Sequence, residues 1–290
     1  MRSAKPFALA LAGLCFWTLS PSVGRAAAPC LGDSAAQAPR YSVAVVPQLP
    51  AADLHRAWAP ALDRIGRTTG HCYDLVLTKT IPEFEELFLK GTPDFAFLNP
   101  YHQVMAHARQ GYRPLVADTT RLTGILVVRK DSKLQSLKDL NGQSIAFPAP
   151  NAFAASLLMR AILARDGVST QADYVKTHNN VYRSVVQGGH IAGGGVNNTL
   201  EREPEALQQQ LRVLYETPGF SPHPLSVHPR VDAAAAGALQ KTVLGLQSSE
   251  EGRRLLDEIQ MPKPRVVSQQ ADYQPLVDLR LESFVVRSKN

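Results

Sequence analysis

The 290-residue sequence contains no apolar segment of the about 20 residues that a membrane-spanning helix needs. The nearest candidate, the run from Phe7 to Leu19, is too short; it follows Arg2 and Lys5 and precedes the small residues of "GRAAA" at 24–28. A basic start, a short apolar run and small residues are together typical of a secretory signal peptide. We therefore expect residues 1–27 to be removed on export and the remaining chain to be a soluble periplasmic protein.

Cysteine is scarce, with three residues in the whole chain. Cys15 lies in the expected signal peptide, so the exported protein keeps Cys30 and Cys72. In an oxidising compartment two such cysteines most often pair, and we predict a disulfide that holds the mature N-terminus. The alternative is a thiol pair that captures a soft metal, but two thiols without a nearby histidine or carboxylate make a poor metal site. The sequence thus predicts no metal and no cofactor.

No region of the sequence carries a large excess of charge of one sign. The formal net charge is +6, and the three basic residues of the signal peptide account for half of it. The remaining Lys and Arg are scattered among Asp and Glu, as on an ordinary solvated surface, and predict no nucleic-acid partner.

Signatures of catalysis are missing as well. The sequence has no Ser-His-Asp order, no metal-ligand spacing, no phosphate-cradling P-loop and no carboxylate pair in the loops expected to carry a site. We therefore do not expect an enzyme, although an enzyme on the same scaffold remains an alternative.

What the chain does contain is a regular alternation of strand and helix patterns. One unit extends from Tyr41 to Thr120 and a second of similar length from Arg121 to Thr217, followed by helical segments after a Pro-rich stretch. Such alternation predicts α/β architecture, with a parallel or mixed sheet flanked by helices in each unit.

Two crossings between the units are expected, at 120–129 and 221–229. They would form a two-stranded hinge between lobe 1 (residues 28–121 and 227–290) and lobe 2 (residues 122–226), which is the plan of a type II periplasmic binding protein. Ligands favour domain interfaces and the carboxyl ends of strands, so the loops after "AVV", "FAF", "IAF" and "GGGV" should line a cleft between the lobes.

Five segments in order strengthen this interpretation: "VVPQ", "DFAFLNPYHQV", "GILVVRKDSKLQSLKDLNGQSIAFPAP", "THNNVYRSVVQGG" and "AGGGVNN". Together they resemble the phosphate-, phosphite- and phosphonate-binding periplasmic proteins of ATP-driven uptake systems. The resemblance implies a monomer that captures a small anion by hinge closure and delivers it to an inner-membrane ABC permease. A ligand-sensing partner of a membrane histidine kinase is the alternative, and the sequence does not separate the two.

The chain departs from that family in the loop after "IAF". Proteins of the family usually carry Ser-Thr-Ser there, and the matching residues are Ala152, Phe153 and Ala154. The backbone N–H groups at the helix start remain available to an anion, but the hydroxyl donors are lost. Asn151 either contacts the ligand or caps the helix. Phe153 either lines the cleft or packs in the core.

Further candidate contacts come from other loops. The resemblance places the hydroxyl of Tyr101 and the imidazole of His178 in the cleft, where they should meet across the ligand. Asn197 lies at the end of the glycine-rich strand. Arg121 and His223 lie in the two crossings. The alternative for Arg121 is a surface charge; the alternatives for His223 are a metal ligand together with His178 or a hydrogen bond to a backbone carbonyl.

Overall fold

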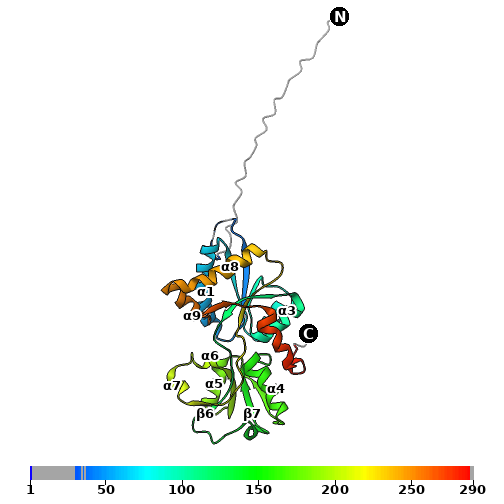
Figure 1. Ribbon diagram of the computed structural model, residues 1–290, viewed down its shortest axis with the longest axis vertical. Helices are drawn as coiled ribbons and strands as arrows, with labels where there is room; N and C mark the ends of the chain where they lie inside the picture. The colour runs from blue at the N-terminus through cyan, green and yellow to red at the C-terminus, as the bar shows by residue number, and fades with distance from the viewer. Residues whose placement is uncertain (2–29, 34, 36, 288–290) are drawn as a thin grey trace.

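The computed structural model describes residues 30–33, 35 and 37–287, together with Met1. Apart from Met1, the expected signal peptide lies outside these residues. Figure 1 shows two lobes stacked along the long axis, with the last described segment running back along their junction. Within the described part of the chain, no helix has both the length and the apolarity that crossing a membrane requires.

Lobe 1 is built on a seven-stranded mixed sheet with the order β1-β3-β2-β4-β11-β5-β12. Strand β2 is parallel to β3 and β4, whereas β11 is antiparallel to both β4 and β5. The strands are β1 (Leu31–Gly32), β2 (Arg40–Val45), β3 (Cys72–Leu77), β4 (Phe95–Phe97), β5 (Arg113–Asp118), β11 (Pro224–Val227) and β12 (Pro264–Val266). The helices of this lobe are α1 (Ala51–Thr69), α2 (Ile81–Leu89), α3 (Pro100–Gln110), α8 (Ala233–Gly245) and α9 (Glu250–Glu258).

Lobe 2 is built on a five-stranded mixed sheet with the order β10-β6-β9-β7-β8. Strand β7 is parallel to β8 and β9, and β6 is antiparallel to β9 and β10. The strands are β6 (Gly124–Arg129), β7 (Ser144–Phe147), β8 (Gln171–Tyr174), β9 (Ala192–Val196) and β10 (Leu211–Glu216). The helices are η2 (Phe153–Leu157, a π-helical turn), α4 (Leu158–Arg165), α5 (His178–Val186), α6 (Asn197–Leu200) and α7 (Glu205–Gln208). The two sheets confirm the α/β, two-lobed fold expected from the alternating pattern.

The helices form where the sequence supplies an apolar face and defined ends. In α1 the buried residues Leu54, Trp58, Leu62 and Ile65 recur at helical spacing and face the sheet, and Gly70 ends the helix in the left-handed conformation. The segment 200–210 is not one continuous helix: α6 ends at Leu200, and α7 begins only after Pro204. This proline has no N–H to donate and disfavours helical backbone in the residue before it.

The glycines of β9 are required by close packing within lobe 2. A Cβ atom on Gly194 would lie 2.1 Å from the carbonyl oxygen of Ala155, and one on Gly124 in β6 would lie 2.4 Å from the carbonyl oxygen of Ala154. Only glycine lets the backbone of η2 approach these two strands so closely. The glycine-rich strand thus fixes the start of the helix at the face of lobe 2 that meets lobe 1.

The lobes are joined where the chain crosses between them, in residues 119–123 and 217–223. An antiparallel bridge pairs Leu122 with Phe220, and the N–O distances of its two backbone hydrogen bonds are both 2.9 Å. Strand β11 joins the sheet of lobe 1 from Pro224 onward, before the lobe boundary expected at residue 227.

A C-terminal strap, which we define as residues 274–287, also links the lobes; in Figure 1 it lies above α4, at the right of the junction. Nη2 of Arg160 in α4 donates to the carbonyl oxygen of Phe284 at 2.8 Å. Asn151 of lobe 2 donates to the carbonyl oxygen of Val286 at 2.8 Å and accepts from its N–H at 3.0 Å. The strap therefore adds a third connection between the lobes.

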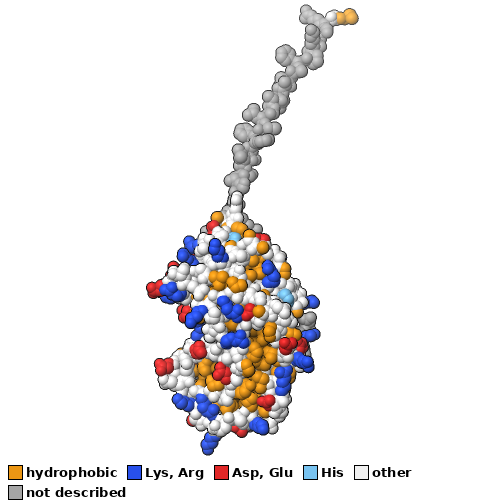
Figure 2. Space-filling view, in the orientation of Figure 1, with side chains coloured by type: hydrophobic (Ala, Val, Ile, Leu, Met, Phe, Trp, Pro, Cys, Tyr) orange, Lys and Arg blue, Asp and Glu red, His pale blue; other side chains and the backbone are white. Residues whose placement is uncertain are grey.

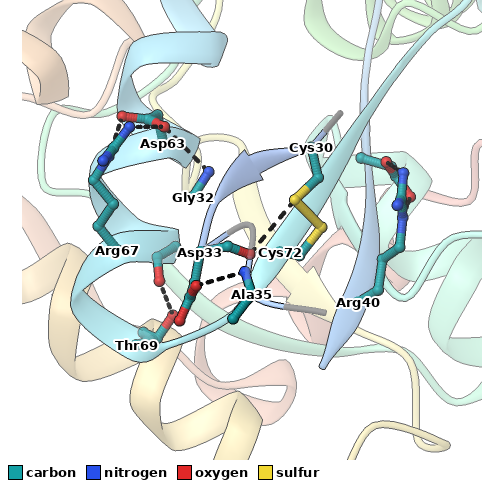
Figure 3. Close-up of a disulfide and its surroundings, with 11 residues drawn as sticks. Cys30, Gly32, Asp33, Ala35, Arg40, Asp63, Arg67, Thr69 and Cys72 are labelled. Atoms are coloured by element: carbon teal, nitrogen blue, oxygen red, sulfur yellow. Dashed lines mark hydrogen bonds and ion pairs between the residues drawn. A yellow bond between two sulfur atoms is a disulfide. The ribbon is translucent and has the colours of Figure 1, made fainter. Parts of the chain in front are cut away.

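The predicted disulfide between Cys30 and Cys72 is confirmed (Figure 3), with the two Cα atoms 5.6 Å apart. It ties Cys30 to β3, next to the short strand β1, which pairs with β3. A bond across a separation of 42 residues constrains the unfolded chain and contributes roughly 3–4 kcal/mol to stability. Because both sulfur atoms are in this disulfide, neither is free to bind a metal in this structure.

Candidate functional site

A small cavity lies where the two lobes and the hinge meet, and we call it the interlobe cavity. Its volume is about 10 Å³, which is room for roughly one water molecule. The lining comes from the ends of β2, β4, β7 and β9, the start of α2 and α5, and both crossings: Val46, Gln48, Ile81, Asn99, Leu122, Ala152, Phe153, Ala154, Ala155, His178, Val196 and His223. The carboxyl ends of strands from both lobes therefore converge on one point.

His223 reaches the cavity from the second crossing. Its Nε2 lies 2.5 Å from Nε2 of Gln48, and its ring stacks on that of Phe97 with centroids 5.5 Å apart. Burial lowers the pKa of His223 to about 3, with smaller contributions from the nearby His102 and His178. The imidazole is thus neutral at pH 7, and because the amide of Gln48 donates to Nε2, Nδ1 carries the ring proton.

His178 reaches the cavity from the opposite lobe. It is the first residue of α5, after the N-cap Thr177. Its Nδ1 lies 3.3 Å from Oγ1 of Thr199, which donates its own proton to the carbonyl oxygen of Val196. Burial lowers the pKa of His178 to about 4, so this ring is neutral too. Nδ1 is engaged by Thr199, so Nε2 is the ring nitrogen that remains for a ligand.

The start of the helix after β7 forms the lobe 2 side of the cavity. Ala152 precedes η2. Ala152, Phe153 and Ala154, the residues that match the Ser-Thr-Ser loop of the family, all line the interlobe cavity. N–H groups in the first turn of a helix have no intrahelical acceptor, and they carry a partial positive charge. The side chains at these positions add apolar surface and no hydroxyl group.

Phe153 fulfils both roles that the sequence left open. It lines the interlobe cavity, and it is also packed, at 2% exposure, in the apolar cluster that continues from lobe 1 into lobe 2. Its ring stacks on Tyr101 of lobe 1, with centroids 6.3 Å apart and an interplanar angle of 10°. Tyr101 itself does not line the cavity. Burial, with a smaller effect of the nearby Glu282, raises the pKa of Tyr101 to about 12.

Asn151 serves the interface between the lobes. It is not the N-cap of the helix, because Ala152 occupies that position. Its Nδ2 donates to Oε2 of Glu85 in α2 at 3.1 Å, and its carbonyl oxygen accepts from Nδ2 of Asn99 at 3.1 Å. Oε1 of Glu85 in turn lies 3.0 Å from Nε2 of His102, and all four side chains are buried. A buried polar network therefore joins the lobes beside the cavity.

The other two candidates lie outside the interlobe cavity. Nη2 of Arg121 donates to the carbonyl oxygen of Gly219 at 2.5 Å, and the side chain is exposed. Asn197 holds the same crossing: its Oδ1 accepts from the N–H of Thr123 at 3.2 Å, and its Nδ2 donates to the carbonyl oxygen of Arg121 at 3.1 Å. Both residues therefore stabilise the hinge.

Arg121 and Asn197 line a second space, of about 340 Å³, which we call the hinge notch. Its wall is formed by Asp118, Thr120, Arg121, Leu122, Asn197, Asn198, Glu201, Arg202, Pro222, Asp257, Gln260 and Pro262. Figure 2 shows the surface indented between the lobes on the side of α9 and α6. Two interlobe contacts cross this notch: Asn198 donates to Gln260 at 2.9 Å, and Arg202 donates to the carbonyl oxygen of Asp257.

The lining of the interlobe cavity is mostly apolar, with four polar side chains, those of Gln48, Asn99, His178 and His223. Among the described residues that line it, none carries a formal charge at pH 7, since the two histidines are neutral. The neutral rings and the amides of Gln48 and Asn99 supply hydrogen bonds of both polarities. The described residues include no group of three or more metal-ligating side chains.

Sequence reasoning missed Gln48, although it lies in the quoted segment "VVPQ", directly after β2. The rule that ligands bind at the carboxyl ends of strands had selected this loop, together with those after β4, β7 and β9, but no residue within it was singled out. Ala155 and Leu122 carry no polar group, so no chemical pattern marks them in the sequence.

Comparisons with known proteins agree with this architecture. A family model described as "ABC transporter, phosphonate, periplasmic substrate-binding protein" matches residues 43–273. No curated protein sequence matches the chain.

Solved structures with a similar fold come from several bacteria. A binding protein component of an ABC phosphonate transporter from Pseudomonas aeruginosa is 16% identical, with a TM-score of 0.75, over 84% of this chain and 86% of that one. A Prochlorococcus marinus protein in complex with methylphosphonate is 14% identical, with a TM-score of 0.77, over 85% and 99%. A Xanthomonas citri protein bound to chloride is 18% identical, with a TM-score of 0.70, over 85% and 99%. At these identities the likeness shows the fold alone.

Proposed function

Because this chain belongs to the family of periplasmic substrate-binding proteins of phosphonate ABC transporters, we propose that it captures a small phosphorus oxyanion between its lobes and delivers it to an ABC permease. The observation that carries the proposal is the interlobe cavity, where four strand ends, a helix start and two buried histidines converge. A ligand bound there would contact both lobes at once, and these shared contacts couple ligand capture to hinge motion.

Each part of the cavity has a role in this proposal. The N–H groups at the start of η2 donate to the anionic oxygens, in a region of partial positive charge. Nδ1 of His223 donates a further hydrogen bond. Nε2 of His178, the ring nitrogen that Thr199 does not contact, forms a hydrogen bond with another oxygen of the ligand. The lack of Lys and Arg among the described lining residues favours a singly charged ligand over a doubly charged one.

Closure follows from the same geometry. A ligand in the interlobe cavity contacts His223 and Gln48 on one side and His178 and η2 on the other. It therefore binds the closed form more tightly than an open one. The equilibrium between open and closed lobes shifts by that difference in affinity. The closed form is the one we expect the permease to recognise. No catalytic step is assigned to the site.

The proposal is tested by identifying what the protein carries and binds. Mature protein purified from a periplasmic extract should release a small phosphorus oxyanion that mass spectrometry detects. Calorimetric titration with phosphite, methylphosphonate and phosphate should then give saturable binding to at least one of them, with poor binding of phosphate because the loop lacks hydroxyl donors. Failure of every phosphorus oxyanion to bind would refute the proposal. Turnover of a bound compound would indicate an enzyme instead.

A further inference from the structure

Phe153 lies at the point where lobe 1, lobe 2 and the hinge meet. Its ring stacks on Tyr101 of α3 and contacts Phe220 of the second crossing edge-on, with centroids 5.3 Å apart. The side chain is 2% exposed. It therefore belongs to the contact that the two lobes make when they are closed, and it lines the interlobe cavity from inside that contact.

The ring also limits the space available to a ligand. Phe153 is the largest side chain that lobe 2 contributes to the cavity lining, and its neighbours there, Ala152, Ala154 and Ala155, are small. With the ring in place the cavity measures about 10 Å³, roughly the room for one water molecule. Any oxyanion must therefore gain its space from a movement of this ring or of the lobes.

The backbone that carries the ring has no room to withdraw. The carbonyl oxygens of Ala154 and Ala155 lie against Gly124 and Gly194, so closely that a Cβ atom at either glycine would collide with them. The start of η2 is thus seated on β6 and β9, and close-packed interiors adjust little to added volume. The side chain at position 153, rather than the main chain, decides how large a ligand the closed lobes accept.

We propose that Phe153 sets an upper limit on ligand size, so that the site takes phosphorus oxyanions bearing hydrogen or a methyl group and rejects phosphonates with longer substituents. The inference rests on the proposed function and names the substrate class of the same cavity. A pocket that must accommodate one extra methylene discriminates by about 10- to 200-fold. Truncating the ring should remove that discrimination, because the freed volume adjoins the ligand.

The test compares ligands of graded size on matched variants. Calorimetry is carried out with phosphite, methylphosphonate, ethylphosphonate and propylphosphonate on the unmodified protein, Phe153→Ala and the milder Phe153→Leu. Phe147→Leu is the control, since Phe147 is also a buried phenylalanine of lobe 2 but does not line the cavity. Far-UV circular dichroism confirms that each variant is folded.

The unmodified protein should bind phosphite or methylphosphonate at least about tenfold more tightly than ethylphosphonate, and Phe153→Ala should reduce that ratio by at least about tenfold. Phe153→Leu should reduce it less, and Phe147→Leu should leave it unchanged. Equal affinity of the unmodified protein for short and long phosphonates would overturn the size limit, as would an unchanged ratio in both Phe153 variants. If no phosphorus oxyanion binds any of the proteins, the proposed function itself fails, and the size limit with it.

Discussion

The interlobe cavity and the hinge notch lie between the same two lobes but are built in opposite ways. Leu122 lines both, so the crossing strands separate them. The cavity has a volume of about 10 Å³, and its described lining residues are uncharged at pH 7; the notch has a volume of about 340 Å³, and two arginines and three carboxylates line it. The lobes therefore close tightly on one side of the hinge and leave a charged, hydrated opening on the other.

The difference follows from the cost of removing charge from water. A charge in the tightly closed cavity would need a partner and a full set of hydrogen bonds, whereas a charge in the notch stays hydrated. The polar groups near the cavity are accordingly neutral rings, amides and one hydrogen-bonded carboxylate, Glu85. We infer that contacts on the cavity side govern stability and binding, and that contacts across the notch contribute little to either.

The largest effect on folding stability should come from lowering the pH, which protonates the two histidines that line the interlobe cavity. The folded-state pKa values of His178 and His223, about 4 and about 3, lie below the ordinary value of 6.5. As the pH falls, the two histidines of the unfolded chain therefore take up protons before those of the folded protein. The stability that the neutral rings provide is complete above about pH 6.5 and is lost as the pH falls toward 4. Each ring should account for on the order of 2–3 kcal/mol of that loss by pH 4.5.

Urea unfolding at pH 7 and at pH 4.5 measures this effect. His178→Asn and His223→Gln, which keep the bonded nitrogen position of each ring, should each make the loss on acidification smaller. His55→Gln is the control, because His55 is an exposed histidine of α1. Equal losses in all four proteins would show that the two buried rings do not govern the acid response.

The next effect concerns the buried network beside the cavity. Glu85→Ala removes the partner of both His102 and Asn151, and two buried polar groups that lose a hydrogen bond cost about 1–3 kcal/mol each. We expect a loss of about 3 kcal/mol in the free energy of unfolding, measured in urea. Glu86→Ala, one residue along the same helix, removes only the exposed pair with Lys90 and should cost under about 0.5 kcal/mol. Similar losses in the two variants would contradict the distinction between the cavity side and the exposed surface.

Ligand affinity should respond to the cavity and not to the notch. A hydrogen bond to a charged oxygen is worth about 1.5–3 kcal/mol, so His223→Gln should weaken methylphosphonate binding at least about tenfold. Arg121→Ala, in the notch, should change the dissociation constant less than about twofold. Calorimetric titration of both variants measures this difference. A larger loss of affinity in Arg121→Ala than in His223→Gln would instead place the ligand site in the notch.

The smallest effect is expected across the notch itself. The carboxylate of Asp257 lies 3.9 Å from the guanidinium of Arg202, and 70% of the Asp257 side chain is exposed. Such exposed pairs contribute about 0–1 kcal/mol. Arg202→Met should therefore change the urea midpoint only slightly, and a loss as large as that of Glu85→Ala would show that the notch contacts hold the lobes together.

The architecture was accessible from the sequence because it depends on local periodicity. Strand and helix patterns and the rule on strand ends placed the loop that carries Ala152, and the resemblance supplied His178 and the ligand class. The positions of Tyr101 and Asn151 were not accessible in the same way. Asn151 bonds to the C-terminal strap, which packs from the far end of the chain against lobe 2, and Tyr101 stacks on Phe153 of the other lobe; no local pattern encodes either contact.

The exchange of hydroxyls for Ala152, Phe153 and Ala154 was visible in the sequence, but its consequence was not. Whether a phenylalanine lines a cleft or packs in a core depends on how far the lobes close, which is a property of all the interlobe contacts together. The structure places Phe153 in both environments because the core of lobe 1 continues across the interface.

A crystal structure of the mature protein with methylphosphonate tests the central claim most directly. The account predicts density for the ligand between His178 and His223, in contact with the start of η2, with Phe153 displaced just enough to admit the methyl group. Ligand density beside Arg121 and Arg202 in the hinge notch, with the interlobe cavity unchanged, would contradict it.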